Sequence, residues 1–312
     1  MAKKDALSIN NIGLIGVGLM GYGIGVNLLK SGHKLFITKH KQEKNISKLK
    51  NQGANLKKSY KEVASYCDVI ILCLPDSSAV EEVVLKENGL INFLKPGSVI
   101  IDCTTSDSTS VEKIRKLLAG KSSYLLDAPL TRSPKDSLLG KLNVIVGGDF
   151  DTYKNVNPVI KTFAENIFYV GETGSGIKLK LLNNFICMGF VLVVTHALAY
   201  AEKENIDVKK LDKIMSEGTN YISAIPLMIK WLNNKEEQVL QFSIKNASKD
   251  ISYFKNSTNK CNIDHRLLDC MDEIFKQATH SKFGEKELPS LYDFILSCQN
   301  NKLKTNNKNL QR

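Results

Sequence analysis

Metal-ligand spacing is absent from this 312-residue sequence. Its seven cysteines are odd in number, scattered, and form no Cys-x-x-Cys or Cys/His pattern. We therefore predict no metal site, and reduced thiols that serve mostly for packing, as in a cytosolic protein. No secretory signal is visible, because the start leads straight into a glycine-rich unit. A cytoplasmic location is expected.

Long apolar runs are also scarce. The longest, Phe185 to Ala201, has 17 residues and is interrupted by Thr195 and His196, whereas a spanning helix needs about 20. We expect no membrane partner and interpret the run as a core or interface helix. Because it is apolar on all sides, we also predict a homodimer or homotetramer.

Basic segments interleaved with aromatic residues, typical of nucleic-acid binding, are missing too. The net charge is +11, but the lysines are spread along the whole chain. We expect no nucleic-acid partner, and a small anionic substrate would account for part of the charge. With 43% hydrophobic residues, the chain is a globular protein of about two domains.

What is present begins with a dinucleotide-binding pattern. The apolar run 9–15 leads into Gly16-Val-Gly18-Leu-Met-Gly21, and a helical segment follows. Gly16 permits a tight turn, Gly18 lets the backbone approach a pyrophosphate, and Gly21 lets the helix pack on the strand. The phosphates would meet free N–H groups at the positive end of the helix.

The end of the second expected strand indicates which cofactor is bound. An acid there binds the ribose 2′-hydroxyl of NAD, but this sequence has Thr38-Lys39-His40-Lys41 and no acid before Glu43. Cations suit a 2′-phosphate, so we predict NADP over NAD, with Thr38, Lys39 and His40 as contacts. The alternative is that the lysines are exposed turn residues.

Strands and helices alternate as far as residue 170. Strands are expected at 34–38, 69–74, 98–102, 123–127, 142–146 and 168–170. This alternation predicts an α/β fold, a Rossmann-type doubly wound parallel sheet, with ligands beyond the carboxyl ends of the strands.

An all-α region follows. Helices are predicted at 176–203, 207–217, 222–233, 239–256, 264–279 and 287–301. We expect residues 1–172 to form the dinucleotide-binding domain and residues 173–301 a helical substrate and dimerisation domain. Residues 302–312 are expected to be a disordered basic tail.

A lysine at the start of the helical region is the first catalytic candidate. Lys180 and Asn184 are at i and i+4, so they share a helix face, and they follow Gly174-Ser-Gly176. A buried lysine can be tuned to exchange protons near neutral pH. The alternative is a solvated lysine on the helix surface.

Two further polar groups are candidates for substrate contact or for the surface. Thr131-Arg132-Ser133 follows a strand end and combines hydroxyls, a guanidinium and backbone N–H groups, which suits a carboxylate or another oxyanion. The alternative is a turn with a solvated arginine. Lys249-Asp250, taken alone, is a surface ion pair of little energetic value.

Together these segments resemble the β-hydroxyacid dehydrogenase family, that of 3-hydroxyisobutyrate dehydrogenase and tartronate semialdehyde reductase, over nearly the entire chain. Four motifs match in order: Gly13 to Gly21, with Leu19 and Met20; Asp127-Ala-Pro-Leu-Thr131; Gly174-Ser-Gly176 with Lys180 and Asn184; and Lys249-Asp250. Leu74-Pro75 and Asp102 to Thr105 are similar to the loops that line the nicotinamide in that family.

The resemblance implies reversible oxidation of a 3-hydroxy acid to its semialdehyde. It implies that Lys180 is the general acid/base, Asn184 orients the substrate and Thr131 binds its carboxylate. Lys249 would close the site and touch both substrate and cofactor. The implied cofactor contacts are Gly16, Gly18, Leu19, Met20, Gly21, Leu74, Pro75 and Thr105.

Departures from the family pattern refine this expectation. The family usually has Ser-Gly-Gly at 131–133, and Arg132 is instead similar to the sulfolactaldehyde reductases, where an arginine meets a sulfonate. We therefore expect a second anionic group on the substrate. Asn183 replaces the histidine of 6-phosphogluconate dehydrogenases, which disfavours that decarboxylation. The alternative function is a non-catalytic nucleotide-binding or reader protein, against which the retained Lys180 argues.

Overall fold

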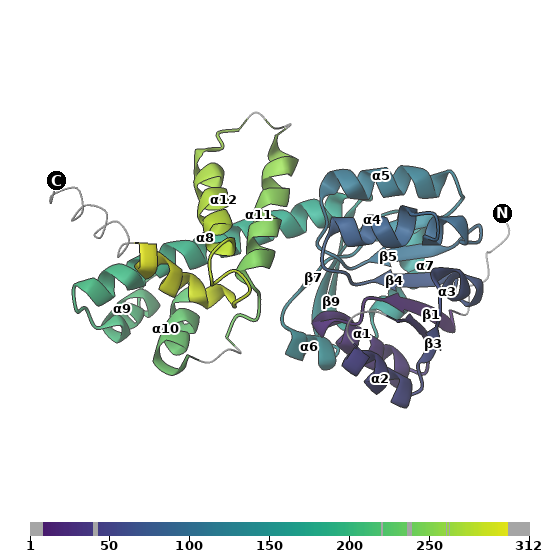
Figure 1. Ribbon diagram of the computed structural model, residues 1–312, viewed down its shortest axis with the longest axis horizontal. Coiled ribbons are helices and arrows are strands. Elements are labelled where there is room, and N and C mark those ends of the chain that lie inside the picture. Colours follow the sequence, from purple (N-terminus) through teal and green to yellow (C-terminus); the bar gives the residue numbers. More distant parts are fainter. Residues whose placement is uncertain are drawn as a thin grey trace. The chain divides into compact units, whose positions relative to one another are not determined.

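The computed structural model describes residues 9–39, 43–219, 221–235, 239–259, 261 and 263–298. The chain divides into two compact units, Met1–Leu181 and Leu182–Arg312 (Figure 1). The division lies inside a long helix rather than near residue 172, because the first turn of that helix is hydrogen-bonded to a strand end of the first unit. His40, Lys41 and the expected tail 302–312 lie outside the described residues.

The described part of the first unit contains one nine-stranded sheet in the order β3-β2-β1-β4-β5-β6-β8-β7, with β9 paired to β8. The predicted parallel arrangement is confirmed from β3 through β6. Inner strands are buried along their length because both faces of the sheet are covered. The strands are β1 (Asn11–Ile15), β2 (Lys34–Thr38), β3 (Asn55–Lys57), β4 (Val69–Leu72), β5 (Val99–Asp102), β6 (Tyr124–Asp127), β7 (Leu130–Thr131), β8 (Leu142–Gly147) and β9 (Ala164–Gly171).

The sheet is parallel for most of its width, and β8 is the exception. This strand pairs antiparallel with β6 and β7 and parallel with β9. A parallel return requires a crossover of about a dozen residues or more, but only residues 132–141 separate β7 from β8. The chain therefore turns back at this edge, and the loop that carries Arg132 lies between β7 and β8.

Helices cover both faces of the sheet, with α4 and α5 on one side and α1 and α2 on the other (Figure 1). Aspartate or serine side chains cap α3, α4, α5, α6 and α7 at their N-termini, which explains where these helices start. The elements are α1 (Leu19–Lys30), α2 (Glu43–Asn51), α3 (Tyr60–Tyr66), α4 (Ser77–Leu85), η1 (Leu90–Asn92), α5 (Ser108–Ala119), α6 (Pro134–Leu138) and α7 (Phe150–Ile160).

The second unit is helical, as predicted, and its core includes Met228, Trp231 and Phe275. Helix α11 begins after the expected residue 239, because Ser243 caps it through the Asn246 N–H group. The elements are α8 (Ser175–Lys203), which starts in the first unit, α9 (Val208–Ser216), α10 (Ala224–Asn234), α11 (Ile244–Thr258), α12 (Arg266–Thr279), η2 (Leu288–Ser290) and the helical residues 291–298.

Helix α8 is 29 residues long, and its length and composition would allow it to cross a membrane. The run Phe185 to Ala201, from which we expected no membrane partner, is thus only part of this helix. A core helix of a globular unit passes the same test. Met188, Val191 and Leu198 of α8 are buried in the hydrophobic core of the second unit, which is the behaviour of a core helix.

Candidate active site

The glycine loop between β1 and α1 has the shape that a dinucleotide site requires. Gly16 has a φ of 95°, and a side chain there would collide with the Cys73 carbonyl. A Cβ atom on Gly18, by contrast, would meet nothing within 4 Å. Gly18 is also the N-cap of α1 and provides no side-chain cap, so the N–H groups that open the helix suit a phosphate. The loop therefore fits the pyrophosphate of a nicotinamide dinucleotide.

Asn45 of α2 supports this loop and was not predicted. Its Nδ2 atom donates to the carbonyl of Val17 at 3.0 Å and to that of Gly18 at 3.4 Å. Asn45 follows the glycine loop by more than a full βα unit, and no local pattern in the sequence marks it. We identify it as a side chain that fixes the loop rather than as a ligand.

The predicted cofactor-selecting residues are only partly described. Thr38 is buried at the end of β2. Lys39 is exposed and lies 3.7 Å from Glu43, the first acid after the strand. An exposed pair of this kind is weak, so the Lys39 amine can readily turn to an anion. His40 lies outside the described residues.

The two loops predicted to line the nicotinamide adjoin each other. They follow β4 and β5, which are neighbouring parallel strands, and the Leu74 N–H group donates to Thr104 Oγ1 at 3.0 Å. Pro75 and Thr105 are the next residues in each loop. In the loop after β1, Leu19 is 68% exposed, whereas Met20 packs against the core. Of these two residues, Leu19 therefore has the side chain that a ligand can contact.

Lys180 is buried, with 8% of its surface exposed, which excludes the alternative of a solvated surface lysine. It lies near the start of α8, where the Gly174 and Ile177 N–H groups each donate to the Asp127 carboxylate at 2.7 Å. Burial raises the pKa of the Asp127 carboxyl to about 7, although these two N–H groups lower it. The catalytic candidate is therefore carried on a helix start that is fixed to the end of β6.

Asn184 follows Lys180 by one helical turn and belongs to a buried polar group in the second unit. Its Nδ2 atom donates to Asp250 Oδ2 at 2.7 Å, and the Lys249 amine lies 3.2 Å from Asp250 Oδ1. Asp250 is only 2% exposed. The interpretation of Lys249-Asp250 as a surface pair is therefore wrong, because the Asp250 carboxylate is buried and orients the Asn184 amide.

The structure assigns protein partners to two members of the Thr131-Arg132-Ser133 group. Arg132 Nη1 donates to Glu165 Oε2 at 2.5 Å and to the Lys141 carbonyl at 2.6 Å. Ser133 forms a capping box with Asp136 at the start of α6. Arg132 is nevertheless an exposed residue, so both its interpretation as a solvated arginine and the binding of the substrate by Thr131, Arg132 and Ser133 stay predictions.

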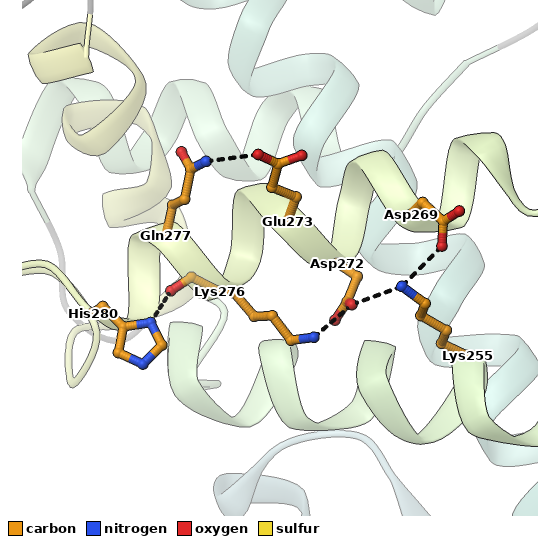
Figure 2. A pocket seen from close by; sticks show the side chains of 7 residues that line it. All are labelled: Lys255, Asp269, Asp272, Glu273, Lys276, Gln277 and His280. Atoms are coloured by element: carbon orange, nitrogen blue, oxygen red, sulfur yellow. Dashed lines mark hydrogen bonds and ion pairs between the residues drawn. The ribbon is translucent and has the colours of Figure 1, made fainter.

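One hollow in the described residues lies elsewhere, on α11 and α12 (Figure 2). Its volume is about 610 Å³, and it contains none of the predicted site residues. Figure 2 shows its charged side chains paired with one another: Asp272 accepts from Lys255 and Lys276, at 3.2 and 2.7 Å. We interpret these ion pairs as contacts that hold α11 and α12 together. Among the described residues, no three His, Cys, Asp or Glu side chains are grouped to hold a metal ion.

Comparison with known proteins gives matches along both units. A family model described as the NAD binding domain of 6-phosphogluconate dehydrogenase matches residues 11–171. A second, described as NAD-binding of NADP-dependent 3-hydroxyisobutyrate dehydrogenase, matches residues 174–295. These two ranges contain the described residues of the glycine loop, Lys180, Asn184 and Lys249.

Individual relatives agree with the models. The probable mitochondrial 3-hydroxyisobutyrate dehydrogenase of Dictyostelium discoideum is 26% identical over 294 residues, 92% of this chain and 91% of the relative. The mouse cytokine-like nuclear factor N-PAC is 25% identical over 90% of this chain, which spans only 50% of N-PAC. The fold is that of the 3-hydroxyisobutyrate dehydrogenase of Mycobacterium tuberculosis, with a TM-score of 0.82, 22% identity, and coverage of 92% of this chain and 99% of that one.

The site geometry and the matches have a common explanation. A glycine loop shaped for a dinucleotide is followed by a helix that carries a buried lysine and an oriented asparagine, and the matching models cover both. The chain belongs to the β-hydroxyacid dehydrogenase family, the NAD(P)-dependent oxidoreductases related to 3-hydroxyisobutyrate dehydrogenase.

Proposed function

We propose that this protein interconverts a small anionic 3-hydroxy acid and its semialdehyde, with NADP favoured over NAD. The observation that carries the proposal is Lys180, a lysine that is 8% exposed on a helix start anchored to a strand end. A charged side chain is rarely buried without a role, because desolvation is costly. Family membership makes proton exchange with a substrate hydroxyl the appropriate role.

In the proposed reaction, the Lys180 amine accepts the hydroxyl proton of the substrate during oxidation and returns it during reduction. The Asn184 amide, oriented by Asp250 at 2.7 Å, donates to or accepts from the same substrate. Thr131 is proposed to bind the substrate carboxylate. A bound nicotinamide supplies the hydride acceptor in one direction and the hydride donor in the other.

The likeness to N-PAC supports a second candidate function. This chain aligns with half of a nuclear factor, so a non-catalytic nucleotide-binding role on the same fold is the alternative. The two candidates differ in what they require of Lys180. A binding protein needs the glycine loop but has no use for a buried amine near the substrate.

The test is a screen of the full chain against 3-hydroxy acids and semialdehydes with both cofactors, followed by absorbance of the reduced nicotinamide. Lys180→Ala should lower kcat by about 10²–10⁴-fold, the usual contribution of a general acid/base, and leave the cofactor Kd nearly unchanged. Lys178→Ala is the matched control, because Lys178 is on the same helix and exposed. Nucleotide binding without turnover of any substrate would favour the binding protein, whereas full turnover by Lys180→Ala would show that Lys180 is not the general acid/base.

A further inference from the structure

Asp127 is a buried carboxylate for which the proposed reaction has no direct use. It ends β6 and is 1% exposed. It is level with Asp102 on β5 and opposite Gly147 on β8. Buried carboxylates are uncommon unless hydrogen-bonded or paired, so its partners indicate what it does.

Those partners are N–H groups of the residue before α8 and of the first turn of α8. Gly174 N donates to Asp127 Oδ1 and Ile177 N to Oδ2, each at 2.7 Å. A helix normally satisfies such groups with a side chain at its own N-cap. The residue before α8 is Gly174, which has no side chain, so a carboxylate from a distant strand takes that place. Its negative charge also suits the positive end of the helix.

The space around this carboxylate leaves no room for side chains at the two neighbouring glycines. A Cβ atom on Gly147 would lie 2.6 Å from Asp127 Oδ1, and one on Gly176 would lie 2.9 Å from Oδ2. Side chains at either position would push the helix away from the strand end. Two glycines and two hydrogen bonds therefore define one position and one rotation for the first turn of α8.

Lys180 is three residues beyond Ile177, within one turn of the same helix. Any shift or rotation of the first turn is passed to it directly. We propose that Asp127 is a positioning residue for Lys180: by holding the first turn of α8 in a two-glycine socket, it sets where the lysine amine meets the substrate. The inference rests on the proposed function, because it concerns the same reaction.

The main variant is Asp127→Asn, which keeps the size of the side chain but replaces one acceptor with an NH₂ group. A displacement of about 1 Å at a reacting group can cost about 10²-fold in rate. We expect kcat to fall by about 10–100-fold, while the KM for the cofactor changes by less than about 2-fold.

A double-mutant cycle separates positioning from general damage. If Asp127 acts through Lys180, Asp127→Asn should lower kcat in the wild-type chain but cause little further loss when Lys180→Ala is already present. An equal loss in both backgrounds would overturn the inference. Unfolding curves and cofactor binding establish that each variant is folded, and Gly176→Ala should reproduce the kcat loss without removing the carboxylate.

Lysine labelling gives a readout that does not require turnover. The full chain is treated with an amine-reactive reagent, and mass spectrometry compares Lys180 with exposed Lys178 on the same helix. Asp127→Asn should increase the labelling of Lys180 relative to Lys178 by several-fold, and an unchanged ratio would overturn the inference. If the wild-type chain turned over no substrate and Asp127→Asn still increased the labelling of Lys180, the proposed function would be contradicted. The role of Asp127 in positioning Lys180 would not be.

Discussion

Asn184 donates to the Asp250 carboxylate at 2.7 Å, and both side chains are buried. Asp250→Ala leaves the Asn184 amide without its acceptor and Lys249 without its counter-charge. We expect the free energy of unfolding to fall by about 1–3 kcal/mol, the usual cost of an unsatisfied buried group, and kcat to fall with it. Urea unfolding and steady-state rates measure the two effects.

Asp250→Asn is the informative companion variant, because its remaining oxygen can still accept from Asn184. It should be more stable than Asp250→Ala. Glu273→Gln, an exposed change on α12, is the control. An unchanged urea midpoint in Asp250→Ala would mean that the hydrogen bond has little effect on stability.

Cofactor preference is the second prediction. Lys39 is exposed and only weakly paired with Glu43, at 3.7 Å, so its amine can turn to a 2′-phosphate. NADPH should be used with a higher kcat/KM than NADH, and Lys39→Asp should shift the ratio toward NADH. Steady-state rates with both cofactors decide the question, and equal or reversed preference in the wild-type chain contradicts the prediction.

Arg132 gives the third prediction. Its guanidinium is paired with Glu165 at 2.5 Å, so it must exchange this partner for a substrate anion. A charge-assisted hydrogen bond contributes about 1.5–3 kcal/mol, so Arg132→Gly should lower kcat/KM by about 10–150-fold for a semialdehyde with a second anionic group. Simple aldehydes should be affected far less.

The backbone favours this experiment. Arg132 has a φ of 79°, a region that glycine adopts without strain, so loss of activity would not come from a distorted loop. Glu165→Gln, which weakens the competing ion pair, should raise kcat/KM for the same substrate. The idea fails if the best substrate has a single anionic group, or if charged and uncharged aldehydes are affected equally.

The fourth prediction concerns acid stability. Burial alone would raise the pKa of Asp272, but hydrogen bonds from Lys276, Ser252 and Lys255 bring it below its usual value. A carboxyl with a depressed native pKa contributes stability above its unfolded pKa of about 4, and this is lost as the pH falls through the native pKa. Asp272→Asn removes this carboxylate. It should therefore lower the free energy of unfolding more near pH 7 than at pH 3.

Urea unfolding at several pH values checks this. Asp269→Asn is the matched control, because Asp269 also pairs with Lys255 but is 54% exposed, where ion pairs contribute little. If Asp272→Asn and Asp269→Asn lost the same stability at every pH, burial of Asp272 would have no special importance.

The fifth prediction concerns assembly. Helix α8 exposes apolar side chains at roughly helical spacing, including Ile186 (48%), Phe190 (46%) and Val193 (63%). A second copy would cover them, so we expect at least a dimer in solution by light scattering at micromolar concentration. Val193→Glu should weaken the assembly, whereas Leu117→Glu, at an exposed apolar position on α5, should not. A monomeric wild-type chain contradicts the prediction.

Local patterns predicted much of this protein. Gly16 and Gly18 could be identified because a dinucleotide turn has a fixed spacing, and the helix that carries Lys180 because a long apolar run follows that lysine. The pairings that complete the site could not be predicted. Asn45 with Val17, Asp127 with Gly174, and Arg132 with Glu165 join residues from separate elements, and no spacing rule relates such partners.

The direction of β8 was missed for a similar reason. Apolar patterning identifies a strand but not its neighbours, and the antiparallel pairing of β8 follows from the short connection between β7 and β8. The burial of Asp250 was missed because an adjacent Lys-Asp pair looks the same in sequence whether it faces solvent or a core.

The capping box of Ser133 and Asp136 closes the turn after β7, and the helix that follows is held to α1, where Asn27 donates to the Ser137 carbonyl at 2.8 Å. Pro134 has the fixed φ that suits the first position of a helix. For engineering, the exposed Arg132 side chain can be exchanged while the capping box and the contacts with α1 remain. Libraries that vary Arg132 and keep Ser133, Pro134 and Asp136 should therefore yield folded variants with altered substrate preference.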